Sequence, residues 1–124
     1  MTEQRPVLVV DDDEPTQKLL DALMKRQGLP TRIVSNGAEA IERIREEKSF
    51  ACIILDLMMP AVSGHEVIDF IVKEGHDIPV IVCTAAGTRV TDGLNGSVVR
   101  AIVRKPFDID ELAAIVTALA RRTS

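Results

Sequence analysis

Residues 52–60 of the chain read Cys-Ile-Ile-Leu-Asp-Leu-Met-Met-Pro. The apolar run that opens this segment has the length of a buried strand, and it ends on the carboxylate of Asp56. A carboxylate beside a core is unfavourable unless something there needs it, so we predict that Asp56 belongs to a site. Gly64 follows where the chain has turned. The segment therefore indicates a buried strand that carries a functional group at its carboxyl end.

Three further apolar runs end in a similar way. Each leads within two residues into a functional polar side chain: Asp11 and Asp12 after 7–10, Thr84 after 80–83, and Lys105 after 101–103. In an open α/β sheet, ligands bind outside the carboxyl ends of the strands, where the strand order reverses. We therefore expect these carboxylates, the hydroxyl and the ammonium to gather at one edge of a sheet.

The rest of the chain alternates short apolar runs with helical patterns. Strands are expected near 6–11, 31–35, 51–56, 78–84 and 100–104, and helices near 15–27, 37–48, 64–74 and 109–122. Leu19, Leu20, Leu23 and Met24 should share the buried face of the first helix, and Asp108 should cap the last one. Unbroken β-branched runs are typical of strands buried on both faces, as in a parallel sheet. A further helix is due between residues 84 and 100, but the glycines of 85–97 make a poor helix. We therefore expect an open α/β fold whose fourth helix is short, frayed or irregular.

Length and composition narrow the class of protein. The chain has 124 residues, which favours a single domain over 1–124, and apolar residues make up 46% of it. Its net charge of −4 gives no electrostatic footprint for nucleic acid, and no apolar run is long enough to span a membrane. Residues 1–6 are polar, so we expect no signal peptide in them. Cys52 and Cys83 fall inside expected buried strands, so a reducing cytoplasm fits.

The expected cluster of polar groups points to phosphoryl chemistry. Asp11, Asp12 and Asp56 would repel one another unless a cation joined them, and Mg²⁺ is the hard, oxygen-binding ion that suits them best. Lys105 would add a second positive charge, and Thr84 could hydrogen-bond a phosphoryl oxygen. Asp56 is then the natural nucleophile, and its product is an acyl phosphate.

Together these motifs resemble the CheY-like receiver domain of bacterial response regulators. The resemblance covers essentially the whole chain and rests on Val-Val-Asp11-Asp12, Leu55-Asp56-Leu-Met-Met-Pro60 with Gly64, Cys-Thr84-Ala85, and Lys105-Pro106-Phe107. It implies a flavodoxin-like, doubly wound sheet of five parallel strands in the order 2-1-3-4-5. It also implies a signalling domain without separate substrate turnover, whose phosphodonor is a histidine kinase or a histidine phosphotransfer protein and whose target is another protein.

The resemblance assigns a role to each site residue. Asp56 would be the phosphoacceptor; Asp12 and Asp56 would bind Mg²⁺ directly, Asp11 through water, and Met58 through its backbone carbonyl. Thr84 and Lys105 would report phosphorylation to the rest of the domain. A cis Lys105–Pro106 bond is implied as well, a geometry that proline makes accessible.

At three positions the chain departs from the family pattern. An aromatic residue usually stands three residues before the lysine and rotates inward on activation, but Ile102 stands there in this chain. The positions two residues after Asp56 and two after Thr84, which orient the hydrolytic water, hold Met58 and Ala86. Neither can hydrogen-bond a water through its side chain, and Met58 is expected to crowd the approach. We therefore expect an altered route of switching through Thr84 and Ile102, and slow loss of the phosphoryl group.

Two other classes of protein share part of this pattern. A haloacid-dehalogenase-like phosphatase uses the same aspartate, threonine and lysine, but it needs a second acid where this chain has Met58. A pseudo-receiver that binds partners without phosphorylation would have no use for the complete set of acidic residues, threonine and lysine. A small-molecule phosphodonor separates the three classes, because they predict a stable adduct, rapid turnover and no adduct, respectively.

Overall fold

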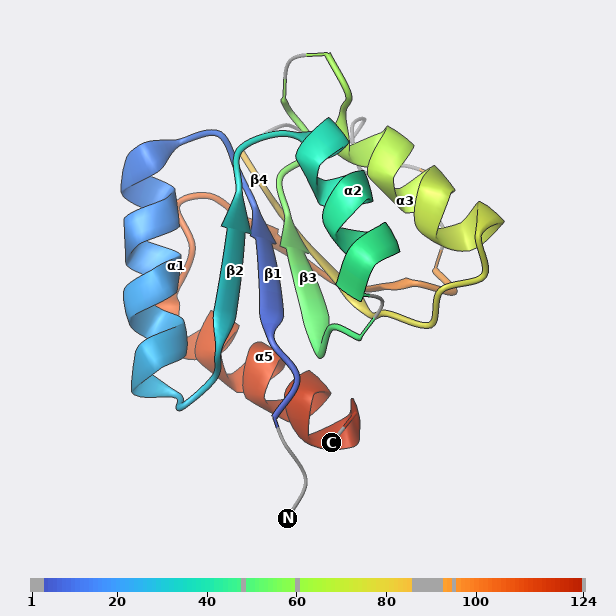
Figure 1. Ribbon diagram of the computed structural model, residues 1–124. Helices are drawn as coiled ribbons and strands as arrows, with labels where there is room; N and C mark the ends of the chain where they lie inside the picture. The colour runs from blue at the N-terminus through green and yellow to red at the C-terminus, as the bar shows by residue number, and fades with distance from the viewer. Residues whose placement is uncertain (1–3, 48, 60, 86–92, 95, 124) are drawn as a thin grey trace.

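Five parallel strands form a central sheet in the order β2-β1-β3-β4-β5 (Figure 1). The computed structural model describes residues 4–47, 49–59, 61–85, 93–94 and 96–123. The strands are β1 (Val7–Val10), β2 (Thr31–Val34), β3 (Cys52–Leu55), β4 (Val80–Thr84) and β5 (Val99–Arg104). The order and the parallel pairing confirm the expected doubly wound fold, and they bring the carboxyl ends of all five strands to one edge.

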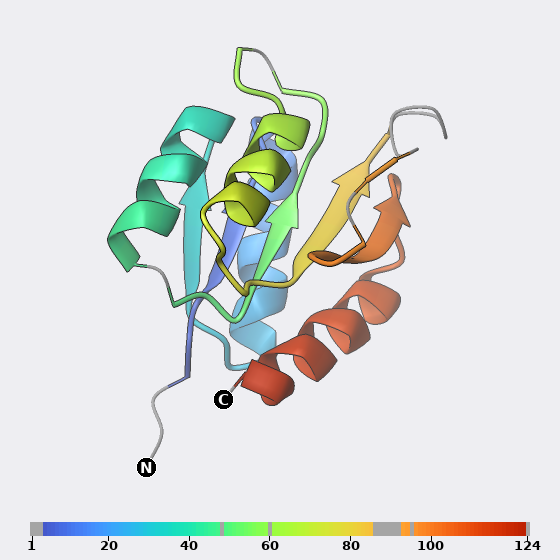
Figure 2. The same cartoon turned by 90° about the vertical axis from the view of Figure 1, so that its right-hand side faces the viewer.

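Helices cover both faces of this sheet (Figure 2). Their bounds are α1 (Glu14–Arg26), α2 (Gly37–Glu47), α3 (Gly64–Lys73) and α5 (Ile109–Thr123). Helices α2 and α3 pack on one face, and α1 and α5 pack on the other. Within the described ranges, no helix is both long and apolar enough to cross a bilayer.

The core is split by the sheet into two layers. Because successive strand residues point to opposite faces, Leu8 and Val10 join the α2–α3 layer, while Val7 and Val9 join the α1–α5 layer. All four residues are completely buried, as is typical of a central parallel strand. The two layers fix β1 from both sides and leave its carboxyl end as the start of the site.

Both cysteines are buried, as the sequence predicts, and they lie in the α1–α5 layer. Burial raises the pKa of the Cys52 thiol to about 12. Burial also raises the pKa of Cys83 to about 12, although the positive charge of Lys105 acts in the opposite direction. At neutral pH both side chains are therefore protonated thiols that serve as small apolar core residues.

The first turns of the helices are capped by side chains. Asp13 caps α1 by accepting a hydrogen bond from the Thr16 amide, and Ser63 caps α3 in the same way. Asp108 was predicted to cap α5, and its Oδ1 does accept a hydrogen bond from the Glu111 amide at 3.0 Å. These caps set where each helix leaves the strand-end loop.

Two predictions about the helices have different outcomes. Leu19 was expected on the buried face of α1, but it is 41% exposed, whereas Leu20, Leu23 and Met24 are buried. At about 100° per residue, Leu20, Leu23 and Met24 fall within one sector of the helix, and Leu19 lies outside that sector on the side of Leu23. The short fourth helix was expected within 85–97, and residues 86–92 and 95 of that segment lie outside the described residues.

Gly64 lets α3 begin directly against the backbone of the site. A Cβ at this position would lie 2.6 Å from the carbonyl oxygen of Asp56 and 2.7 Å from the Cα of Leu57. Both of these neighbours are backbone atoms, which cannot rotate away as a flexible side chain can. The glycine is therefore required by the close approach of two chain segments.

Replacing Gly64 with Ala should lower the free energy of unfolding by about 1–3 kcal/mol, because the methyl group forces the helix and the Asp56–Leu57 backbone apart. Chemical denaturation followed by circular dichroism measures this change. Gly96 is the matched control, since a Cβ there meets nothing within 4 Å. Gly96→Ala should change stability by less than about 0.5 kcal/mol. Equal effects of the two variants would contradict the steric account.

Candidate functional site

Three buried polar side chains mark one edge of the sheet. Within the described residues, the buried polar or charged groups are Asp11, Asp56 and Thr84. Asp11 follows β1, Asp56 follows β3, and Thr84 is the last residue of β4. The parallel pairing of Val10 with Leu55 places the residues that follow them, Asp11 and Asp56, next to each other. Buried polar groups are unfavourable without partners, so their concentration here indicates a built site.

The predicted acidic cluster is formed. Ligand oxygens of Asp11, Asp12 and Asp56 all lie within 4.8 Å of one another. Asp12 is exposed, while the other two are buried, so the cluster opens to solvent on the Asp12 side. Carboxylate oxygens at this spacing are the hard donors that Mg²⁺ prefers, and the three residues fit such an ion. Asp13 and Glu14 remain outside the cluster at the start of α1.

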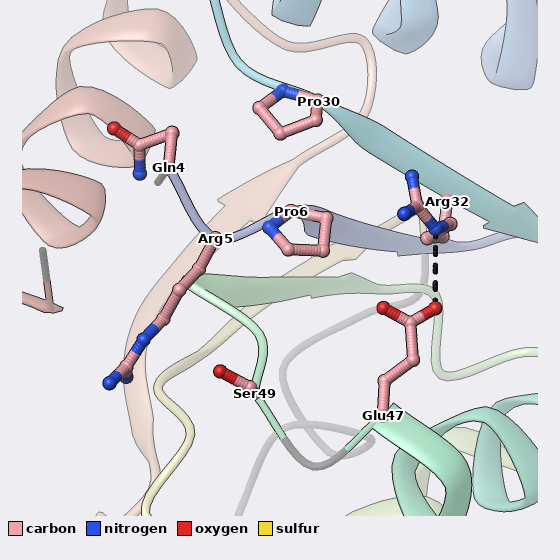
Figure 3. Close-up of a pocket in the computed structure, with 7 residues that line it drawn as sticks. All are labelled: Gln4, Arg5, Pro6, Pro30, Arg32, Glu47 and Ser49. Atoms are coloured by element: carbon pink, nitrogen blue, oxygen red, sulfur yellow. Dashed lines mark hydrogen bonds and ion pairs between the residues drawn. The ribbon is translucent and has the colours of Figure 1, made fainter. Parts of the chain in front are cut away.

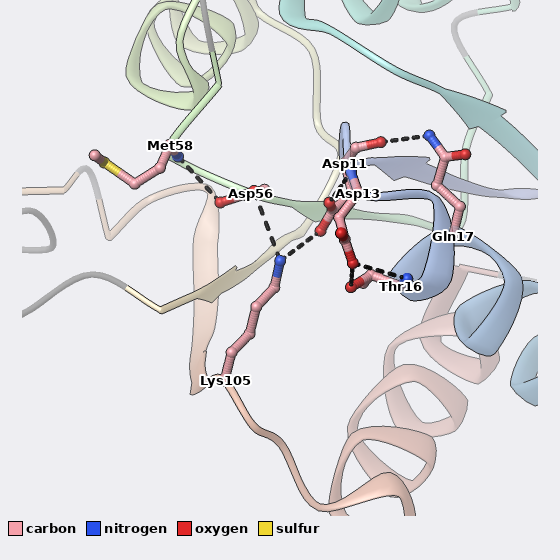
Figure 4. Close-up of polar contacts among 7 residues, drawn as sticks. All are labelled: Asp11, Asp13, Thr16, Gln17, Asp56, Met58 and Lys105. Atoms are coloured by element: carbon pink, nitrogen blue, oxygen red, sulfur yellow. Dashed lines mark hydrogen bonds and ion pairs between the residues drawn. The ribbon is translucent and has the colours of Figure 1, made fainter.

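Lys105 brings a positive charge to the two buried carboxylates (Figure 4). Its Nζ lies 2.7 Å from Asp11 Oδ2 and 3.6 Å from Asp56 Oδ2. Burial lowers the pKa of Lys105, but the hydrogen bond to Asp11 and the charges of both aspartates outweigh it, so the pKa is raised. The side chain is therefore a fixed cation at neutral pH, and its first partner is Asp11.

The backbone around Lys105 also contributes to the geometry. The Lys105 amide donates a hydrogen bond to the carbonyl oxygen of Thr84 at 2.9 Å, which ties the end of β5 to the end of β4. The Lys105–Pro106 peptide bond is cis, as the resemblance implied. Thr84 itself is completely buried at the end of its strand. The predicted hydroxyl and ammonium thus belong to one connected edge.

The Asp56 carboxylate is held between a backbone donor and the lysine. Its Oδ1 accepts a hydrogen bond from the Met58 amide at 3.0 Å, and its Oδ2 faces Lys105. Burial raises the pKa of Asp56; the Met58 amide and Lys105 act in the opposite direction, and the charges of Asp11 and Asp12 raise it further. The ionised form of Asp56 is therefore disfavoured in the folded protein, and a bound cation would favour it.

Asp11 has partners on its side chain and on its backbone. Its Oδ1 accepts a hydrogen bond from the Asp13 amide at 2.9 Å, and its carbonyl oxygen accepts one from Gln17 Nε2 at 2.5 Å. Gln17 Nε2 also donates to Ser35 Oγ at 3.1 Å. Sequence reasoning missed Gln17 and Ser35. The one available signal was a long amide side chain in the first turns of the helix that follows the acidic pair.

The residues predicted to control water access and switching lie at the rim. Met58 is 59% exposed, and its side chain points away from Asp56 (Figure 4), so the prediction that it crowds the approach is wrong. It nevertheless brings no polar side-chain atom to the site. Ile102 is 43% exposed on β5. Ala86 lies outside the described residues.

A separate cavity of about 390 Å³ lies at the opposite edge of the sheet, where the strands begin (Figure 3). It is lined by Gln4, Arg5, Pro6, Pro30, Arg32, Glu47 and Ser49. Arg32 Nε pairs with a Glu47 oxygen at 3.2 Å, so two of the three charged side chains that line the cavity neutralise each other. This cavity shares no residue with the acidic cluster.

Comparisons with known proteins agree on one family. The family model described as the response regulator receiver domain matches residues 7–117. The transcriptional regulatory protein SrrA of Staphylococcus aureus is 37% identical over 119 residues, which are 94% of this chain and 48% of that protein. The chain thus spans about half the length of the curated relatives it matches.

Solved structures of response regulators are also similar to this chain. The receiver domain of the Francisella response regulator 1452 superimposes with a TM-score of 0.84 at 30% identity, over 97% of this chain and 99% of that one. The response regulator TrrA of Thermotoga maritima, solved in complex with Mg(2+)-BeF, has a TM-score of 0.82 at 31% identity, over 93% of this chain and 98% of that one.

Removing the charge of Asp56 should stabilise the metal-free protein. The folded-state pKa is raised, so at neutral pH the ionised carboxylate destabilises the fold, and Asp56→Asn removes that effect. We expect a rise of about 3–5 °C in melting temperature at pH 7, which corresponds to about 1 kcal/mol for a domain of this size. The gain should vanish near pH 3, where the carboxyl is protonated in the folded and unfolded states alike.

Thermal unfolding in EDTA, followed by circular dichroism, measures this difference. The control is Asp69→Asn on the exposed side of α3, which should leave the melting temperature unchanged. An Asp56→Asn protein that melts below the wild type at pH 7 would show that the lysine and the Met58 amide outweigh the burial of the carboxylate.

Proposed function

The chain belongs to the family of response regulator receiver domains of two-component systems, and from this premise we propose that it accepts a phosphoryl group on Asp56. Residues 1–124 then act as one receiver domain that switches partner binding or relays the group onward. The observation that carries the proposal is the Asp56 carboxylate, buried within reach of the Lys105 ammonium and beside two further acids. A carboxylate with this environment has a use as a nucleophile that a solvated strand end lacks.

In the proposed reaction, a carboxylate oxygen of Asp56 attacks the phosphorus of a phosphohistidine. The new phosphorus–oxygen bond forms as the phosphorus–nitrogen bond breaks, and the imidazole leaves as a neutral ring after it takes up a proton. The Met58 amide orients the attacking carboxylate by bonding its Oδ1. Lys105 stays protonated, because its pKa is raised, and it offers positive charge to the incoming phosphoryl oxygens.

The acidic cluster supports Mg²⁺ as the cofactor. Asp12 and Asp56 would bind it directly, Asp11 through water, and the Met58 backbone carbonyl would supply a further oxygen. When bound, Mg²⁺ neutralises charge on the phosphoryl oxygens during transfer. The support from this chain is the set of three carboxylates whose oxygens lie within 4.8 Å of one another, two of them paired with Lys105.

The donor and target follow from the family and the chemistry. Receiver domains of response regulators are phosphorylated by histidine kinases, and we propose a histidine kinase or a histidine phosphotransfer protein as the donor, in the cytoplasm. The net charge of −4 favours a protein target over direct contact with nucleic acid. The domain would work stoichiometrically, without turnover of a separate substrate.

Thr84, Lys105 and Ile102 form the proposed route by which phosphorylation is reported. Thr84 and Lys105 are already joined by a backbone hydrogen bond, so a change at either residue reaches both strand ends. Ile102 lies on β5 beside this pair, half-exposed and without the ring of an aromatic residue. The response should therefore depend on movement of an aliphatic side chain between solvent and core.

Asp56→Asn should abolish phosphorylation while the fold is retained, because an amide of nearly the same shape is a poor nucleophile. Intact-mass spectrometry after treatment with acetyl phosphate and Mg²⁺ should show an added phosphoryl mass for the wild type and for the Asp69→Asn control. It should show none for Asp56→Asn. An adduct of equal yield on Asp56→Asn would assign the reaction to another residue, rapid turnover without an adduct would favour a phosphatase, and an unmodified wild type would favour a pseudo-receiver.

The phosphorylated wild type should lose its phosphoryl group slowly, since Met58 has no side-chain group to orient a hydrolytic water. Met58→Asn should shorten the lifetime about tenfold, within the usual range for acid–base and positioning effects. Met58→Leu is the matched control, because it stays apolar, and its lifetime should equal that of the wild type. Decay of the phosphorylated mass over time measures all three proteins. Loss within seconds from the wild type, or an unchanged rate in Met58→Asn, would contradict this account.

A further inference from the structure

We propose that Gln17 is a positioning residue for the acidic cluster, and that it acts through the backbone of Asp11 on the direction of the Asp12 carboxylate. The inference rests on the proposed function, since it concerns the same Mg²⁺ site. Gln17 stands on α1, and its Nε2 donates to the carbonyl oxygen of Asp11 at 2.5 Å and to Ser35 Oγ at 3.1 Å (Figure 4 shows the first of these). The two hydrogens of one amide group thus hold two different strand-end loops.

The bond to the Asp11 carbonyl matters because of the geometry of the peptide group. The carbonyl of Asp11 and the amide nitrogen of Asp12 belong to the same planar unit, so fixing the oxygen fixes the plane from which the Asp12 side chain departs. The Asp12 carboxylate is exposed, and packing therefore does little to orient it. The side chain of Asp11 is already held by the Asp13 amide and by Lys105. Gln17 supplies the missing constraint on the backbone between the two acids.

The second hydrogen bond of Gln17, to Ser35, holds the Gln17 side chain in place from another loop. Ser35 directly follows β2, and the next residue, Asn36, holds the first turn of α2. Asn36 Oδ1 accepts a hydrogen bond from the Glu39 amide at 2.9 Å, and its Nδ2 donates to Glu39 Oε1 at 2.7 Å. Gln17 therefore ties the metal site to the start of a second helix. Outer partners of this kind commonly tune metal affinity, because they fix the direction of the inner ligands.

Gln17→Met is the direct test, since methionine keeps the length of the side chain and removes both donors. Gln27→Met is the matched control at the other end of α1. Gln27 caps the helix and its Oε1 accepts a hydrogen bond from Thr117 Oγ1 at 3.2 Å, so this variant also loses one contact between two elements. Both variants should lower the melting temperature in EDTA by a similar amount. Only Gln17→Met should change the metal site.

The chain has no Trp or Tyr, so Mg²⁺ binding is followed by NMR of the backbone amides. The dissociation constant for Mg²⁺, read from the amides of residues 11–13, should rise about tenfold in Gln17→Met and stay unchanged in Gln27→Met. Phosphorylation by acetyl phosphate should need about tenfold more Mg²⁺ for half-maximal rate, while the rate at saturating Mg²⁺ remains near that of the wild type. If Gln17 only stabilised the fold, the variant would not raise the Mg²⁺ requirement while leaving the rate at saturating Mg²⁺ unchanged.

Ser35→Ala completes the experiment by removing the outer partner alone. It should weaken Mg²⁺ binding by a smaller factor, and the Gln17→Met, Ser35→Ala double variant should bind no more weakly than Gln17→Met. Equal Mg²⁺ affinity of Gln17→Met and wild type, or equal losses in Gln17→Met and Gln27→Met, would overturn the inference and leave the proposed function intact. Absence of Mg²⁺-induced shifts at residues 11–13 and 56–59 in the wild type would overturn the proposed function, and the inference with it.

Discussion

Repulsion among three carboxylates at the ends of two adjacent strands is the constraint on which the site depends. Ligand oxygens of Asp11, Asp12 and Asp56 lie within 4.8 Å of one another, and at the effective dielectric near a protein surface each such pair repels by a few kcal/mol. Lys105 relieves part of this repulsion, but it lies closer to Asp11 than to Asp56. Burial, together with the charges of Asp11 and Asp12, raises the pKa of Asp56, so the ionised form of the proposed nucleophile is the form that an added cation would favour.

The sheet supports this arrangement because its central strands are buried on both faces. β1 and β3 pair in the middle of the sheet, which makes Asp11 and Asp56 neighbours although they are far apart along the chain. Lys105 follows β5, which lies two strands from β3 and three from β1, so a long flexible side chain is needed to reach both aspartates. The apolar layers of helices on either side contribute nothing to the chemistry directly. They hold the strand ends in register, so that the charges cannot move apart.

Much of this could be predicted from the sequence, and the residues show why the rest could not. Asp56, Asp11, Thr84 and Lys105 each follow an apolar run, and parallel topology then brings them together without further information. Leu19 was misplaced because adjacent leucines on α1 look equally apolar, and only packing decides which one faces the sheet. Gln17 was missed because its role depends on distances to a backbone oxygen and to Ser35, neither of which leaves a pattern in the sequence. The direction of the Met58 side chain is likewise a property of the folded loop.

The contact at Gly64 restricts the Asp56 backbone on the side of α3 but not on the side of β4 and β5. On the side of α3, the backbone of Asp56 and Leu57 meets the helix with no room for even a methyl group, so it cannot retreat that way. On the other side stand the end of β4 and the edge strand β5, where Ile102 is half-exposed and has space to move. The Gly64 contact therefore leaves the Asp56 backbone no room to move toward α3. If a phosphoryl group on Asp56 displaced its surroundings, the movement would have to be taken up away from α3, where β4 and β5 end.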